Sequence, residues 1–210
     1  MYKRQDAARG GLRQVLSSPA LLRLNIGVFV LHAVQLAMWV AIPAFLVQAG
    51  LAKNDHWQIY LPAVLGSFLL MGGVFALERR GFLRAVFLSA IALIALVQVA
   101  LLWVSSGAPS VTCLAWLLFA FFCGFNVLEA TQPSLVSRIA PASSRGAAMG
   151  VYNTLQSLGF FAGGVMGGQL VKSYGTQGLF LTCAALMVLW LVVAWPMVAP
   201  KRVAHSAKTP

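Results

Sequence analysis

The sequence predicts an all-α integral membrane protein with six transmembrane helices and both termini in the cytoplasm. Three observations lead to this fold class. Of 210 residues, 60% are hydrophobic and only 9% are charged, whereas soluble domains are about half apolar and a quarter charged. The apolar residues form six runs, each long enough to cross a bilayer. The basic residues are concentrated in the short segments between alternate runs.

The six apolar runs define the expected spans. A helix needs about 20 mostly apolar residues to cross the hydrocarbon core. Because backbone groups in lipid must be hydrogen-bonded internally, and these runs are too long for barrel strands, each run is expected to be a helix. The expected spans are 22–47, 57–77, 82–104, 111–137, 146–171 and 178–198. They make a transmembrane domain over 21–199, with cytoplasmic segments at 1–20 and 200–210.

The positive charges set the orientation. Thirteen of the 15 Lys and Arg residues fall on one side of the expected membrane, and only Lys53 and Lys172 fall on the other. Cytoplasmic loops carry the excess of Lys and Arg, so the termini are expected in the cytoplasm and the number of spans is even. The net charge of +11 is thereby explained without nucleic-acid binding. The thirteen are Lys3, Arg4, Arg9, Arg13, Arg23, Arg79, Arg80, Arg84, Arg138, Arg145, Lys201, Arg202 and Lys208.

The sequence carries little that indicates an enzyme. It shows no nucleophile–base set, phosphate-binding loop or metal-ligand spacing. The three cysteines, Cys113, Cys123 and Cys183, lie inside apolar runs, where they are best explained as small packing residues. We therefore expect no enzymatic activity, no metal site and no cofactor.

Polar side chains within the fourth span mark a candidate site. Glu129 is the only acidic residue well inside a span, and a carboxylate there is costly unless it faces a cavity or a partner. Asn126 lies three residues earlier on the same helical face. Glu129 is a candidate for carrying protons or contacting substrate. The alternative is a structural carboxylate, bonded to a neighbouring helix or paired with Arg138.

The first and fifth spans carry further polar side chains. His32, Gln35 and Trp39 are spaced three and four apart in the first span, so they share one face. A polar and aromatic stripe suits a substrate pathway, although a histidine in such a stripe also serves as an interhelical hydrogen bonder. In the fifth span, Asn153 and Gln156 fit interhelical hydrogen bonding or a pathway role equally well.

The fifth span also contains a nested series of glycines. Three of them, Gly159, Gly163 and Gly167, repeat every four residues and line one face. Small faces let helix backbones approach closely, so generic packing explains such a face by itself. The whole series comprises Gly150, Gly159, Gly163, Gly164, Gly167 and Gly168.

This glycine series resembles the antiporter signature of the major facilitator superfamily, G-x8-G-x3-G-P-x2-G-G, with Gly164 where the family usually has proline. The connection after the second span resembles the D-R-x-G-[RK] loop of the same family, with Glu in place of Asp and Phe82 in place of a basic residue. The residues that carry this second resemblance are Glu78, Arg79, Gly81 and Arg84.

Nearly the whole chain resembles the YajR-like group of drug/proton antiporters within that superfamily. The stretches concerned are Leu21-Leu22-Arg23-Leu24-Asn25, His56-Trp57, Asn126-x-x-Glu129-Ala130, Pro133-Ser134-Leu135, Gly146-x-Ala148-Met149-Gly150-Val151-Tyr152 and Gly163-Gly164-x-x-Gly167-Gly168. The resemblance reaches helices seven to twelve, the carboxyl-terminal half of such a transporter. Residues 1–20 would then correspond to the central interdomain loop.

The resemblance implies a set of roles. The first and fourth helices of each half line the central cavity in this family, and here these spans hold His32, Gln35, Trp39, Asn126 and Glu129. The eleventh helix packs against the second across the boundary between halves. The glycine face is therefore expected to pack against a helix that this chain does not contain.

The implied function is proton-coupled efflux of a small organic compound by alternating access, in the bacterial inner membrane, with Glu129 as the proton carrier. The expected partners are the lipid bilayer, the substrate, protons and a second six-helix half, either a separate chain or a missing amino-terminal half. Two alternatives are a truncated or accessory module without transport of its own and a half-size transporter acting as a homodimer. We expect the isolated chain to be inactive and unstable or self-associating.

Overall fold

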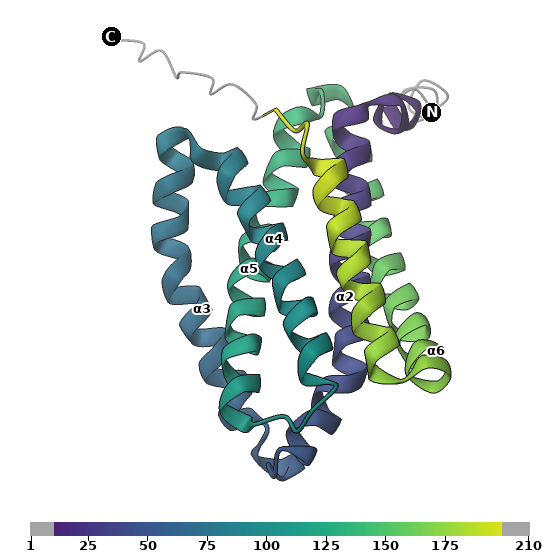
Figure 1. Cartoon of the computed structure of the whole chain (residues 1–210). Helices are drawn as coiled ribbons and strands as arrows, with labels where there is room; N and C mark the ends of the chain where they lie inside the picture. Colours follow the sequence, from purple (N-terminus) through teal and green to yellow (C-terminus); the bar gives the residue numbers. More distant parts are fainter. Residues whose placement is uncertain (1–10, 199–210) are drawn as a thin grey trace.

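The computed structural model describes residues 11–198, which form a bundle of α-helices and contain no strand within that range (Figure 1). Four helical stretches in it are long and apolar enough to cross a membrane. They are Pro19–Gln48, Lys53–Val104, Val111–Ile139 and Ala142–Ala194. The prediction of an all-α membrane protein is confirmed.

Two of the four stretches are about twice as long as a single span requires, and each reverses at a glycine. The second comprises α3 (Trp57–Leu77), η2 (Glu78–Phe82) and α4 (Leu83–Val104), and Gly81 within η2 has φ 99°. The fourth contains α6 (Arg145–Ala194), which is non-helical at Gly175, with φ 67° and ψ −175°. Glycine adopts positive φ without a steric cost. Figure 1 shows α3 and α4 side by side in opposite directions, and α6 folding back on itself.

Serine side chains begin the two uninterrupted helices. Ser18 precedes α2 (Pro19–Gln48), where its hydroxyl accepts a hydrogen bond from Leu21 N and Pro19 occupies the first turn. Ser110 precedes α5 (Val111–Ile139), and its hydroxyl accepts from Cys113 N at 3.2 Å. Both side chains satisfy amide groups that the first helical turn leaves free.

The buried core surrounds α2, which packs against α5 and along the length of α6. The aromatic rings of Phe45 and Phe180 meet across α2 and α6, with centroids 5.7 Å apart. In contrast, α3 contributes only Ala63 and Ser67 to the buried residues and lies at the edge of the bundle (Figure 1). The molecule thus has an enclosed side around α2 and an open side around α3.

The glycine face of α6 packs against α2 within the same chain. A Cβ added at Gly159 would lie 2.6 Å from a backbone oxygen of α2, and one at Gly167 would lie 2.8 Å from a Cα. One at Gly163 would overlap backbone atoms of α2. The residues they face are Phe29, Ala33 and Ala37. The prediction of a partner helix outside the chain is wrong for these three glycines, because a small-residue repeat predicts close approach but does not identify the partner.

The other glycines of the series lie away from this contact. A Cβ at Gly164 would meet the Leu36 side chain at 3.5 Å, an ordinary contact distance. Gly150 and Gly168 are exposed, and within residues 11–198 a Cβ added to either would have no atom within 4 Å apart from the neighbouring backbone of α6 itself. These two positions remain available to a helix from outside.

One end of the bundle carries most of the positive charge. The start of α2, the turn between α3 and α4, and the junction of α5 with α6 lie together at this end, whereas α6 reverses at the opposite end (Figure 1). We call it the arginine-rich end. Its basic residues include Arg79, Arg80, Arg84, Arg138 and Arg145.

Candidate functional site

Three polar side chains from α2, α5 and α6 meet inside the bundle. Nε2 of His32 lies 2.9 Å from Oε2 of Glu129. The side-chain amide of Gln156 donates to Oε1 of Glu129 at 2.9 Å, and its nitrogen also lies 2.9 Å from Nε2 of His32. We call this group the His32–Glu129–Gln156 cluster. It joins three helices through charged or polar contacts.

One hydrogen bond fixes which nitrogen of His32 can exchange a proton. Nδ1 lies 2.8 Å from the backbone oxygen of Val28. A carbonyl oxygen only accepts hydrogen bonds, so Nδ1 carries a proton whether the ring is neutral or charged. The proton that His32 gains or loses is therefore the one on Nε2, which faces Glu129.

Adding that proton changes the partner of Nε2. In the neutral ring Nε2 is an acceptor and can receive a hydrogen bond from the Gln156 amide. In the charged ring Nε2 is a donor, and the acceptor within reach is Oε2 of Glu129, which has no other hydrogen-bond partner within residues 11–198. The cluster thus has two hydrogen-bonding arrangements that differ by one proton.

The two ionisable members differ in exposure. The His32 side chain is 1% exposed, whereas that of Glu129 is 37% exposed. The imidazole is enclosed by the rings of Phe125 and Phe160, with centroids 5.8 Å and 4.6 Å away. The Glu129 side chain therefore links a buried imidazole to the surface of the bundle, although its Oε2 atom is itself buried.

The remaining pathway candidates lie outside this cluster. Nδ2 of Asn126 donates to Oγ of Ser67 at 2.7 Å, which ties α5 to α3. Trp39 stands edge-on to the Tyr60 ring, with centroids 5.0 Å apart. The oxygen of the Gln35 side-chain amide is buried without a hydrogen-bond partner in the described residues.

Among the buried polar residues that the sequence reasoning missed, three lack a hydrogen-bond partner at every side-chain N and O atom within residues 11–198. Asn25, Gln132 and Tyr152 are 3%, 0% and 2% exposed, and their side-chain N and O atoms have no hydrogen-bond partner in the part of the chain described. Each shares a helix with one member of the cluster. Asn25 precedes His32 by seven residues, Gln132 follows Glu129 by three, and Tyr152 precedes Gln156 by four. That helical spacing was a readable signal.

These three residues extend the cluster in one direction. From the rise per residue, Asn25, Gln132 and Tyr152 lie about 10, 5 and 6 Å further along their helices than His32, Glu129 and Gln156. Given the directions of α2, α5 and α6, each displacement is toward the arginine-rich end (Figure 1). Buried polar groups normally find a partner or an ordered water, so this column is a candidate route for water.

The η2 loop after α3 connects separate elements. Oγ1 of Thr131 donates to Oε1 of Glu78 at 2.8 Å. Nη2 of Arg84 donates to the backbone oxygen of Trp195 at 2.8 Å, and its guanidinium lies 5.9 Å from the centre of that ring. Glu78 and Arg84 thus hold the turn to α5 and to the end of α6, while Gly81 supplies the reversal.

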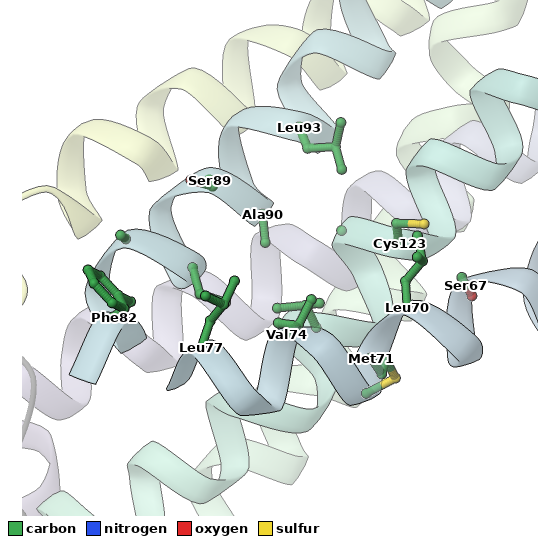
Figure 2. Close-up of a pocket in the computed structure, with 14 residues that line it drawn as sticks. Ser67, Leu70, Met71, Val74, Leu77, Phe82, Ser89, Ala90, Leu93 and Cys123 are labelled. Carbon is green, nitrogen blue, oxygen red and sulfur yellow. The ribbon is translucent and has the colours of Figure 1, made fainter. Parts of the chain in front are cut away.

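A separate apolar crevice lies between α3 and α4. It has a volume of about 450 Å³, and its floor is formed by α5. Figure 2 shows Leu77 and Phe82 at one end and Ser67 and Cys123 toward the other. Among the described residues, no group of three His, Cys, Asp or Glu side chains could hold a metal ion, in the crevice or elsewhere.

Comparison with known families gives a match over the length of the chain. The family model described as Major Facilitator Superfamily matches residues 3–164 and 75–210.

Three curated relatives are transporters by name. The inner membrane transport protein YajR of Escherichia coli (strain K12) is 35% identical over 205 residues, which are 95% of this chain and 44% of YajR. An uncharacterized transporter of Buchnera aphidicola subsp. Schizaphis graminum is 31% identical over 82% of this chain and 44% of its own. One of Buchnera aphidicola subsp. Acyrthosiphon pisum is 30% identical over 67% and 36%. The chain spans less than half the length of these relatives.

Proposed function

The chain belongs to the major facilitator superfamily, and from this premise we propose that it forms six spans of a transporter that couples proton movement at His32 and Glu129 to efflux of a small organic compound. It is a multi-pass membrane protein of a transporter family, which is a non-enzymatic class. The inner membrane is the proposed location, as it is for YajR by name.

The six-span topology has three supports. The two long helical stretches each reverse at a positive-φ glycine, Gly81 or Gly175, so each supplies two arms. Thirteen of 15 Lys and Arg residues fall on one side of the proposed arrangement. The first and last described helical arms have their outer ends at the arginine-rich end (Figure 1). We propose that residues 21–199 are the transmembrane domain and that the arginine-rich end is cytoplasmic.

The observation that carries the coupling proposal is the 2.9 Å contact between His32 and Glu129. An ionisable pair inside a membrane is costly unless its members compensate each other. When Nε2 of His32 is protonated, its hydrogen-bond partner changes from Gln156 to Glu129. This change alters the contacts between α2, α5 and α6. A proton can thus bias the relative positions of helices, which alternating access requires.

The route of the proton and the solute follows from the polar groups around the cluster. We propose that water in the column of Asn25, Gln132 and Tyr152 connects Glu129 with the arginine-rich end. Gln35 and Trp39, on the same face of α2 as His32, are proposed to contact the solute. Asn126 is proposed to act through α3, because its amide is bonded to Ser67.

A second six-helix half is proposed to cover the surface on which the Glu129 side chain is exposed. The Glu129 side chain is 37% exposed, and a partly exposed acidic side chain facing lipid would be unfavourable. Gly150 and Gly168 on α6 offer further open positions for a helix. The second half can come from the same polypeptide as helices seven to twelve or from a separate chain.

Infrared difference spectroscopy on the purified protein tests the proton site without knowledge of the solute. Acidification should give carboxyl and imidazole bands that change together. Glu129→Gln should remove the carboxyl band and alter the imidazole band. His32→Asn should remove the imidazole band and alter the carboxyl band. Bands that titrate unchanged in both variants would remove the cluster from the mechanism.

Transport in vesicles is the second test. The protein, assembled with helices one to six of a matching transporter, should expel ethidium when a proton gradient is imposed. Glu129→Gln should abolish the gradient dependence, while Gln177→Asn, at the opposite end of the bundle, should retain it. Full gradient-driven efflux by Glu129→Gln would contradict the proposal.

A further inference from the structure

We propose that the crevice between α3 and α4 binds one anionic phospholipid, with an acyl chain in the crevice and the phosphate at Arg79 and Arg80. The proposal does not depend on the transport function. It rests on the depth of the crevice, the nature of its walls and the charge at its mouth.

The crevice is as deep as one leaflet of a bilayer. On α3 its wall extends from Leu77 to Ser67, and on the other side it extends from Phe82 to Leu93. Ten and eleven residues of helix correspond to a rise of about 15 Å. The hydrocarbon core of a bilayer is about 30 Å thick, so the crevice ends near its midplane.

The walls suit a hydrocarbon chain. Large flexible side chains such as Leu70 and Met71 line the α3 side, and small ones such as Ala85 and Ser89 line the α4 side. At the floor, a Cβ added to Gly124 would lie 2.9 Å from Ile94, so α4 and α5 close tightly beneath the opening. A polar solute would find few hydrogen-bonding groups here, because Ser67 already bonds Val64 O and Asn126.

The mouth carries positive charge at the depth of the headgroups. Leu77 and Phe82, which line the crevice, lie just before the η2 turn and at its end, and Arg79 and Arg80 lie between them. Both arginines are exposed, and the neighbouring Arg84 is held by Trp195. Basic groups next to a gap between membrane helices favour anionic lipid headgroups. The crevice fits an acyl chain, and the arginines at its mouth fit a phosphate. Together they match the two parts of an anionic phospholipid.

The test is native mass spectrometry of the purified full chain. The delipidated protein is mixed with equal amounts of phosphatidylglycerol and phosphatidylcholine that have the same acyl chains. The protein should retain one phosphatidylglycerol in preference, by roughly tenfold or more for two arginines. Arg79→Gln/Arg80→Gln should lose the preference, whereas Arg13→Gln/Arg23→Gln, which removes the same charge at the same end, should keep it.

A second pair of variants tests the crevice. Ala85→Phe should fill it and remove retention of both lipids, while Val192→Phe, exposed on α6, should change nothing. Should Ala85→Phe fail to fold, Ala85→Leu provides the same obstruction with less bulk. Equal retention of the two lipids by the unmodified protein, or retention of neither, would overturn the proposal. Unchanged preference in the Arg79/Arg80 variant would overturn it as well.

Discussion

The helix pair α2 and α6 and the helix pair α3 and α4 contain similar residues but pack differently. Both pairs have small residues on one helix: Gly163 and its neighbours on α6, and Ala85 and Ser89 on α4. In the first pair the backbones touch, whereas in the second a crevice of about 450 Å³ remains.

The difference lies in what else holds each helix. The long first arm of α6 lies along α2 and is joined to it by the His32–Glu129–Gln156 cluster. By contrast, α3 is tied to α5 by the hydrogen bond between Asn126 and Ser67, and the η2 turn separates it from α4. In lipid, apolar burial does not drive helices together. Two helices with small facing residues therefore pack closely only where other contacts, such as the polar cluster between α2 and α6, also hold them together.

The largest expected effect comes from obstructing the closed pair. Gly163→Leu should lower the free energy of unfolding by more than about 3 kcal/mol, because even a Cβ there overlaps the backbone of Ala33. Gly168→Leu is the matched control and should change it by less than about 0.5 kcal/mol. Unfolding in mixed detergent micelles measures both. Equal effects would mean that the two faces of α6 are packed alike.

A smaller effect should follow from breaking the polar cluster. His32→Leu removes the imidazole that lies 2.9 Å from the Glu129 carboxylate and should cost about 1–3 kcal/mol. In a double-mutant cycle with Glu129→Leu, the second substitution should recover a large part of this loss. Additive losses would show that the two side chains do not interact in the membrane.

The tie that holds α3 should be weaker still. Ser67→Ala removes the acceptor of the Asn126 hydrogen bond and should cost roughly 1 kcal/mol. Ser89→Ala, in the crevice wall, should cost close to nothing. A loss at Ser89 equal to that at Ser67 would contradict the role of this bond in positioning α3.

The smallest effect on stability is expected at the buried polar column. Gln132→Leu replaces an amide that lacks a protein partner within residues 11–198 and should raise the free energy of unfolding by a few tenths of a kcal/mol. It should slow proton exchange at Glu129, measured by time-resolved infrared spectroscopy. A marked loss of stability would instead indicate a partner for Gln132.

The sequence predicted the helices better than their contacts. The length of the apolar run predicted a helix at 111–137, within two residues of α5 (Val111–Ile139). The start was predictable because the polar connection ends at Ser110 and the apolar run begins at the next residue. The partner of Gly163 was misassigned, since a repeat along one helix says nothing about its neighbour. His32 and Glu129 were both candidates, but 97 positions separate them, and only the packing of α2 on α5 brings them to 2.9 Å.

The reversal within α6 has a consequence for how the protein is made. Only a few residues around Gly175 join its two arms, so on the proposed topology they must leave the insertion machinery as a hairpin. Its tip has to be carried across the membrane during synthesis, and Lys172 is the one charged side chain near it. Adding arginines at Ser173 and Thr176 would therefore delay or invert the hairpin before any folded contact exists.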